Sequence, residues 1–447
     1  MDNALLPGLG GPMGRHAAGR GPWFAALPWA IAVGTVLFLL LFLRHTQCVQ
    51  TDAEVQINSY ALLCYSDIQG TFLGQGFGLG ATPFSGETLA FSPLVGVAIL
   101  LAARAAVIVG APVGPGAPLQ DQVDASVAFF GLTVVGLFLC FLLLIAATSR
   151  LGRRGRAPSW DAILVAGSPI VFAVGLISWD LLPLAITALG LAQYARGRAL
   201  ESGIVLGLAA CAGTMPFAVV LAVTVAAGLR GGVRQALTFA GPAAITVAAV
   251  HLPLLLADAG KVFGFYHQEI HKEAGYGSLW YLMSLLGRPL RHAGSLGFLF
   301  LALFLAVLVA YLYVSRRRPR VGSLVAVIIL AATLLGPSFP PQTSLWVMLA
   351  VLVSRPLRQE WVAVTVAHVA HYLAVWGWLA GSLTVSQLGP YGVYWGAIIA
   401  RAAVEAWVLA SSLTDIVDPG RDPLRSPDQP DPLGGELNTG ELAPIAA

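Results

Sequence analysis

The chain has 447 residues, of which 57% are hydrophobic and 11% are charged, and its net charge is +3. Soluble domains carry about 25% charged residues, whereas apolar runs near the ~20 residues needed to span a bilayer recur along this chain. This composition excludes a soluble enzyme and a nucleic-acid-binding protein, and it predicts an all-α polytopic membrane protein. The sequence has no dinucleotide-binding or P-loop motif, so we expect no nucleotide cofactor.

The first apolar segment, residues 23–43, is too long for a signal-peptide core and lacks a small-residue cleavage site. We therefore expect it to be retained as the first membrane helix. Arg15 and Arg20 precede it, which places residues 1–22 in the cytoplasm by the positive-inside rule. The polar stretch that follows, about 44–87, is then the first extracytoplasmic loop.

Two cysteines lie in this loop, Cys48 and Cys64, at either side of a polar segment. An extracytoplasmic loop is in an oxidising compartment, where disulfides form and persist. We predict a Cys48–Cys64 bridge, with two free thiols as the alternative. The bridge would restrain the segment that carries Asp67, in "NSYALLCYSDIQGTF".

Three apolar segments lie between the N-terminal arginines and the next basic cluster, which begins at Arg150. Both clusters are expected inside, so an even number of crossings must separate them. The segment 88–111 contains Pro93 and a central Arg104. We expect this segment to re-enter the membrane or to lie along its surface.

The remaining apolar segments alternate cleanly with basic clusters, giving about 11–13 spans within residues 23–413. Asp180 and the loops at about 257–280 and 337–343 then fall on the extracytoplasmic side. The tail 414–447 is rich in proline, aspartate and glycine, and we predict a disordered cytoplasmic segment.

Two outer carboxylates are candidates for chemistry. Asp67 lies in a loop of aromatic and small residues, although most loop carboxylates are only solvated. Asp180 follows Trp179 at a helix end, where it is either a helix N-cap or a functional group. The tryptophan beside it is an expected interfacial anchor.

The outer loop 257–280 mixes cationic and aromatic side chains. Lys261, His267, His271 and Lys272 are interleaved with tyrosine, phenylalanine and tryptophan. Cationic groups at a membrane surface can hold a phosphate, while aromatic rings suit sugar or lipid faces. His267 and His271 are four residues apart, which also suits a metal on a helix. Because no third ligand is evident, we predict no metal site.

Ionisable residues also occur inside predicted spans. Arg401 and Glu405 lie four apart, and burying either charge alone costs about 2.5–3.5 kcal/mol on insertion scales. Pairing relieves that cost, so we expect a structural ion pair. His368 and His371 are expected to be packing residues.

Several segments together resemble a known family. The stretches, in chain order, are "LCYSDI", "LISWDLLPLAITALG", "GSLWYLMSLLG", "PPQTSLWVMLAVL" and "ARAAVEAWVLASSLTDIVDPGRDPLR". Their order and content resemble actinobacterial membrane proteins of glycosyltransferase family 87, which has the GT-C fold. The family includes polyprenyl-phosphate-mannose-dependent mannosyltransferases. The resemblance covers most of the chain.

The resemblance implies a plasma-membrane enzyme with its active site outside the cytoplasm and no cofactor. A polyprenyl-phosphate donor would pass its sugar to a glycolipid or glycan of the cell envelope, with inversion. Asp67 matches the general base of the first outer loop, and Asp180 is a second catalytic candidate. The substrate-binding candidates are His267, His271, Lys272, Ser278, Trp280 and Gln342.

The chain also departs from the family pattern. Relatives often carry lysines where this sequence has Gly213 and Pro337, and Lys272 takes the place of a family arginine. Lysine cannot form the two-pronged contact of arginine. The alternative function is a transporter of lipid-linked sugars or a non-catalytic partner in envelope assembly.

Overall fold

The computed structural model of the chain describes residues 25–86, 88–151, 160–383, 391–425 and 431–438. Within these ranges the regular structure is entirely helical. This confirms the predicted all-α fold. The N-terminal segment 1–22, expected in the cytoplasm, lies outside the described residues.

Long apolar helices form the body of the protein. Among the described residues, six are long and apolar enough to cross a membrane. They are α3 (Ala26–Thr46), α6 (Leu119–Thr148), α11 (Met215–Ile270), α13 (Ala293–Val314), α16 (Arg358–Leu379) and α17 (Gly392–Val417). This number and their composition agree with a multi-pass membrane protein.

Shorter apolar helices fill the space between the long ones. They are α5 (Pro93–Ile108), α7 (Ala162–Ala166), α8 (Pro169–Val174), α9 (Leu181–Ala195), α10 (Ala199–Ala210), α14 (Val321–Leu335) and α15 (Ser344–Ser354). Helix α10 packs against α9 and α11, and α14 packs against α15 and α17. Helices α14 and α15 are almost completely buried, so they form the centre of the C-terminal half.

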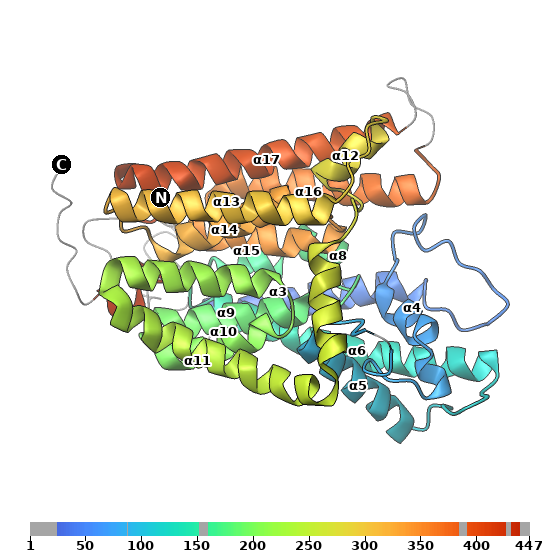
Figure 1. The fold of residues 1–447 in the computed structure, drawn as a ribbon. Helices are drawn as coiled ribbons and strands as arrows, with labels where there is room; N and C mark the ends of the chain where they lie inside the picture. The colour runs from blue at the N-terminus through green and yellow to red at the C-terminus, as the bar shows by residue number, and fades with distance from the viewer. Residues whose placement is uncertain (1–24, 87, 152–159, 384–390, 426–430, 439–447) are drawn as a thin grey trace.

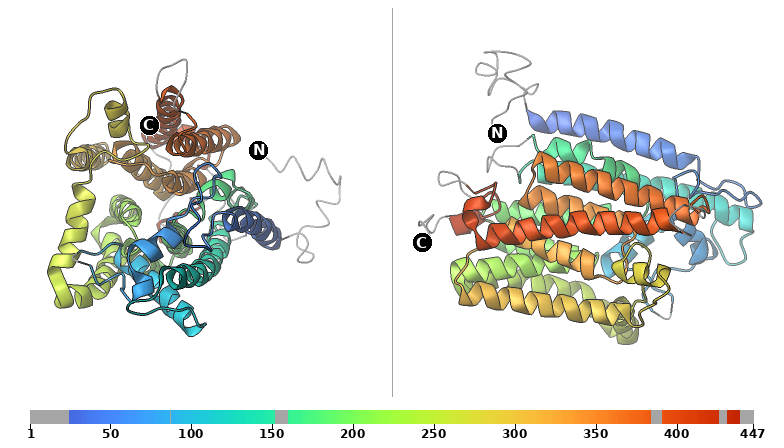
Figure 2. Two further views of the ribbon diagram at one scale, coloured as in Figure 1. Left: turned by 90° about the vertical axis from the view of Figure 1, so that its right-hand side faces the viewer. Right: turned by 90° about the horizontal axis from the view of Figure 1, so that it is seen from above.

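The helices run side by side, and the irregular segments gather at one end (Figure 1). Seen end-on, α13 to α17 lie on one side of the bundle and α3 to α6 on the other (Figure 2). Helix α4 (Asp67–Gly74), helix α12 (Leu279–Leu285) and α5 all lie at the same end. We call this the outer end, because it carries the loops that the charge pattern assigns to the extracytoplasmic side.

Helix α11 is broken twice. Gly232, with φ 78° and ψ −178°, and Asp258, with φ −162° and ψ 93°, depart from helical geometry. The positive φ at the first break favours glycine, which has no Cβ to clash. After the second break, the last part of α11 runs across the outer end of the bundle (Figure 1).

The predicted disulfide is present. Cys48 and Cys64 are bonded, with their Cα atoms 5.8 Å apart, which confirms the prediction. The bridge closes the first outer loop immediately before α4. Cys140 and Cys211 remain free.

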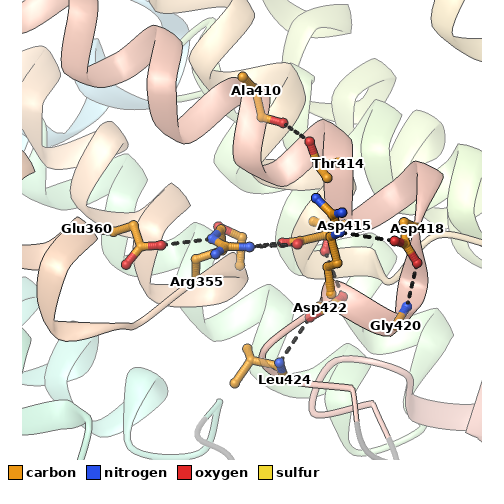
Figure 3. A network of polar contacts seen from close by, with 12 residues as sticks. Arg355, Glu360, Ala410, Thr414, Asp415, Asp418, Gly420, Asp422 and Leu424 are labelled. Atoms are coloured by element: carbon orange, nitrogen blue, oxygen red, sulfur yellow. Dashed lines mark hydrogen bonds and ion pairs between the residues drawn. The ribbon is translucent and has the colours of Figure 1, made fainter.

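The predicted disorder of residues 414–447 is wrong for the described part of this tail. Helix α17 continues to Val417, and a 3-10 turn, η4 (Pro419–Arg421), follows it. Figure 3 shows Arg355 between the carboxylates of Glu360 and Asp415. These contacts fix the tail to the end of the bundle opposite α4.

Two further carboxylates hold the tail to a buried and a partly buried arginine. Asp422 accepts hydrogen bonds from Arg320 Nε at 2.5 Å and Nη2 at 2.9 Å, and Asp431 accepts one from Arg230 at 2.7 Å. Leu433 and Leu437 are buried beside them. The tail is ordered here because cations of the bundle balance its acidic side chains, an effect that local composition does not reveal. We call residues 418–425 and 431–438 the C-terminal strap.

Candidate functional site

Asp67 is the first residue of α4, and the backbone before it is firmly held. Ser66 caps the helix by accepting a hydrogen bond from the Ile68 N–H at 3.3 Å. Its hydroxyl also donates to the Leu176 carbonyl at 2.7 Å, and the Asp67 N–H donates to the Ile177 carbonyl at 2.7 Å. The sequence "YSD" therefore sits directly against "LISWD".

These contacts bring Asp180 to the same place. Asp180 precedes α9, yet its side chain makes no capping hydrogen bond to that helix. Instead its carboxylate accepts a hydrogen bond from the Ser178 hydroxyl. The structure therefore excludes the simple N-cap interpretation. Trp179 is buried rather than exposed at an interface, so the expectation of an interfacial anchor is wrong.

Asp67 and Asp180 line one pocket of about 550 Å³. Its other lining residues are Tyr65, Gly70, Thr71, Gly74, Gln75, Phe91, Val95, Ser178, Trp179, Pro183 and Ala212. The pocket thus contains carboxylates, hydroxyls and an amide, but its lining has no arginine, lysine or histidine. Carboxylates accept hydrogen bonds from hydroxyl groups, so the lining suits a neutral ligand rich in hydroxyls.

Two aromatic rings form an apolar wall of the pocket. The rings of Phe91 and Trp179 meet edge to face, with centroids 5.6 Å apart and planes at 69°. Pockets that combine apolar rings with a few convergent polar groups are the usual form of small-molecule sites. A sugar ring fits this description, because its C–H faces are apolar and its edges carry hydroxyls.

The pKa of each carboxylate is raised. For Asp67, burial is the largest cause; the Tyr65 hydroxyl, which donates at 2.7 Å, acts in the opposite direction, and the nearby charge of Asp180 adds to the rise. For Asp180, burial again raises the pKa, and hydrogen bonds from Ser178 and Trp346 lower it. A carboxylate with a raised pKa is a stronger base once ionised.

Aromatic rings pack together beside the segment that precedes Asp67. The rings of Tyr60 and Tyr65 stack with centroids 4.7 Å apart, and both lie 5.4 Å from the ring of Trp376 on α16. The Tyr372 hydroxyl donates to the Leu63 carbonyl at 2.8 Å. Together with the disulfide, these contacts restrain the loop that carries the candidate base.

The cationic candidates of the outer loop lie on a different element. His267 and His271 are at the end of α11 with their rings stacked at 4.0 Å, and Lys272 pairs with Glu269 at 2.5 Å. None of the three lines the pocket. Across the described ranges, no three His, Cys, Asp or Glu side chains gather as metal ligands would.

The three remaining substrate-binding candidates have different surroundings. Ser278 is buried and caps α12, accepting from the Tyr281 N–H and donating to the Gly275 carbonyl, each at 2.9 Å. The Trp280 indole donates to the Leu335 carbonyl at 2.9 Å. Gln342 lies in the 3-10 turn η3 (Pro341–Thr343), where its buried carbonyl oxygen lacks a partner among the described residues.

The predicted Arg401–Glu405 ion pair is present and completely buried. The histidines expected to be packing residues lie against it. His368 Nε2 is 3.4 Å from a carboxylate oxygen of Glu405, and the ring of His371 is 5.6 Å from that of Phe339. Sequence spacing on α16 and α17 could not reveal this cluster, because it forms across helices.

No protein-family model matches the chain, and no curated protein matches it either. The resemblance to family 87 therefore stays a prediction. The functional assignment depends on the two carboxylates, on their pocket and on its place at one end of a bundle of helices long enough to cross a membrane.

Proposed function

We propose that the protein is a membrane glycosyltransferase of the GT-C type. It moves a sugar, mannose by the resemblance, from a polyprenyl-phosphate donor to a glycolipid or glycan outside the cytoplasm. One observation carries the proposal: Asp67 and Asp180, from separate segments, line a single pocket without cationic groups at one end of a membrane bundle. The pocket lining supports a neutral, hydroxyl-rich ligand.

In this mechanism Asp67 accepts the proton of an acceptor hydroxyl. The acceptor oxygen attacks the anomeric carbon of the donor, and the bond from that carbon to the phosphate oxygen breaks. The phosphate leaves with the electron pair, and attack from the opposite face inverts the anomeric centre. The raised pKa of Asp67 supports this role, because proton transfer is most efficient when the pKa of the base approaches the working pH.

Asp180 orients the acceptor by accepting a hydrogen bond from a second hydroxyl. Its contacts with Ser178 and Trp346 hold the carboxylate in place. The leaving phosphate requires cationic donors, and the pocket lining has none. We therefore assign phosphate binding to His267, His271 and Lys272 at the end of α11, outside the pocket.

A transporter of lipid-linked sugars is the second candidate. Transporters place ionisable groups and broken helices near the bilayer midplane. The buried Arg401–Glu405 pair on α17 fits that pattern, whereas the break of α11 at Gly232 lies two residues after Arg230, which bonds to Asp431 at the end of the bundle opposite α4. Neither feature contributes to the lining of the carboxylate pocket, which favours the enzyme.

The test is transfer of radiolabelled sugar from a lipid extract by the purified protein. Asp67→Asn should reduce the rate by about 10² to 10⁴, as removal of a general base commonly does. Asp180→Asn should have a smaller effect. Asp124→Asn, which changes an exposed carboxylate on α6, is the matched control and should transfer normally.

Two outcomes would contradict these assignments. Normal turnover by Asp67→Asn with loss of turnover by Asp180→Asn would reverse the roles of the two carboxylates. If the unmodified protein transferred no sugar from any lipid-linked donor but moved labelled lipid across vesicles, the transporter would replace the enzyme.

A further inference from the structure

The buried cluster on α17 contacts more than its own helix. Arg401 and Glu405 are both 0% exposed. One terminal nitrogen of Arg401 bonds to Glu405, and the other donates to the Gly277 carbonyl at 2.9 Å. The guanidinium also lies 3.6 Å from the centroid of the Phe339 ring. The arginine therefore reaches two loops of the outer end from inside the bundle.

These two loops are bonded to each other. The Gly275 N–H donates to the Pro337 carbonyl and the Phe339 N–H donates to the Tyr276 carbonyl, each at 2.8 Å. The Gly277 N–H donates to the Tyr394 hydroxyl at 2.9 Å. The peptide groups of Gly277 are thus held on both sides, and the loops behave as one unit with its inner tip at Arg401.

The inner tip of these loops, position 277, requires glycine. Gly277 has φ +76°, and a Cβ atom there would lie 2.3 Å from the Phe339 carbonyl oxygen and 2.9 Å from His371 Nε2. Any larger residue would therefore push the two loops apart or away from α16. The close approach of the loop to Arg401 depends on this position.

Glu405 connects the same cluster to the carboxylate pocket. It accepts a hydrogen bond from Thr333 at 3.0 Å and lies 3.4 Å from His368 Nε2. His368 in turn bonds through Nδ1 to the Ser344 hydroxyl at 2.9 Å. Ser344 begins α15, which also carries Trp346, a hydrogen-bond partner of Asp180.

A buried ion pair is not needed for the stability of a bundle, because well-packed apolar residues often serve as well. Here the planar fork of the arginine satisfies a carboxylate and a loop carbonyl at once, which lysine or an apolar residue cannot do. We propose that Arg401 is a positioning residue: with Glu405 and Gly277 it holds residues 275–278 and 337–343 against the bundle. We call this set of contacts the latch. The latch places α12 and the cationic end of α11 where the phosphate of the lipid donor binds.

The contacts between the loops and Arg401 do not depend on the proposed function, whereas the predicted effect on binding of the lipid donor does. The main variant is Arg401→Met combined with Glu405→Leu, which removes both charges and keeps the volume. The second variant, Gly277→Ala, disturbs the tip without changing any charge. Ser412→Ala is the control, because Ser412 is buried on the same helix and its hydroxyl has no partner in the described part of the chain.

Amide hydrogen exchange of the purified protein measures the latch directly. Both variants should exchange about tenfold faster at the amides of residues 275, 277 and 339, because the double variant loses the hydrogen bond from Arg401 to the carbonyl of residue 277 and Gly277→Ala forces the loops apart. In the transfer assay the KM for the lipid donor should rise about tenfold with kcat changed less than about twofold. Ser412→Ala should change neither quantity.

Unchanged exchange at these amides in the folded double variant would overturn the latch, whether or not the protein is an enzyme. Faster exchange with an unchanged donor KM would overturn the positioning role. If the double variant does not fold, Gly277→Ala decides both points. If the unmodified protein transfers no sugar, the proposed function fails while the exchange measurement still decides the latch.

Discussion

The acidic side chains at the two ends of the bundle have different partners. At the outer end, Asp67 and Asp180 share a pocket whose lining has no cation, and their hydrogen-bond partners are hydroxyls and an indole. At the other end, Asp415, Asp422 and Asp431 each meet an arginine. Both groups are largely shielded from water, so burial alone does not separate them.

This difference indicates which carboxylates are available to react with a ligand. A paired carboxylate at the strap end of the bundle is balanced by its arginine and contributes to structure. A carboxylate that lines a pocket without a cation can accept a proton from a ligand. The pKa does not separate the two groups, because burial also raises the pKa of the paired Asp415. The comparison predicts that changes at the two ends will affect different measured quantities.

The largest expected loss of stability follows from changing Arg320. Its side chain is buried and bonded to Asp422, and removal of one partner leaves an uncompensated buried charge, which costs about 3–5 kcal/mol. Arg320→Met should lower the thermal midpoint strongly without changing donor KM. The double variant with Asp422→Leu should recover part of the loss. Equal loss in single and double variants would contradict the pairing.

Removal of the disulfide should cost somewhat less. A loop closed by cysteines 16 residues apart corresponds to about 3 kcal/mol in the chain-entropy relation. The Cys48→Ser, Cys64→Ser protein should unfold at lower temperature and transfer sugar more slowly, because the loop before Asp67 is released. Cys140→Ala, which removes a free cysteine, is the control. Full activity in the double variant would show that the bridge does not position Asp67.

The pH dependence should separate Asp67 from its neighbour. The base must be ionised, so kcat/KM falls as the pH decreases through the pKa of Asp67. The Tyr65 hydroxyl lowers that pKa, and Tyr65→Phe should therefore move the acidic limb to higher pH. Ser178→Ala, which acts on Asp180, should move it less. An acidic limb shifted to lower pH in Tyr65→Phe would exclude Asp67 as the titrating base.

The same pKa shift has a consequence for stability. Because the pKa of Asp67 is raised in the folded protein, the folded state binds a proton more readily than the unfolded state. The resulting stabilisation is complete below the unfolded pKa and is lost as the pH rises through the folded pKa. In Asp67→Asn this part of the pH dependence of the thermal midpoint should disappear.

The smallest effect is expected at an exposed ion pair. Arg198 and Glu201 lie 3.1 Å apart, with side chains 55% and 50% exposed, and such pairs contribute about 0–1 kcal/mol. Arg198→Ala should change neither thermal midpoint nor transfer rate appreciably. A loss of stability comparable to that of Arg320→Met would mean that solvent exposure does not determine how much an ion pair contributes to stability.

Features set by local sequence were predictable. Helical spans follow from apolar runs, and the disulfide from two cysteines in one outer loop. The order of spans and the positions of basic residues predicted only that Asp67 and Asp180 lie on the same side of the membrane. The pocket lining and the order of the strap depend on contacts between distant segments. Gln75 and Ala212, from distant segments, line the same pocket, and the buried strap leucines carry no periodic signal.

The strap also bears on how the protein is made. Asp422 follows Arg320 by 102 residues, and Asp431 follows Arg230 by 201. At a synthesis rate of about 5–20 residues per second, Asp422 is synthesised roughly 5–20 s after Arg320. During this interval the end of the bundle that binds the strap has a cation without its partner. A stop codon just after α17 would make that temporary state permanent, although every membrane helix would already have been synthesised.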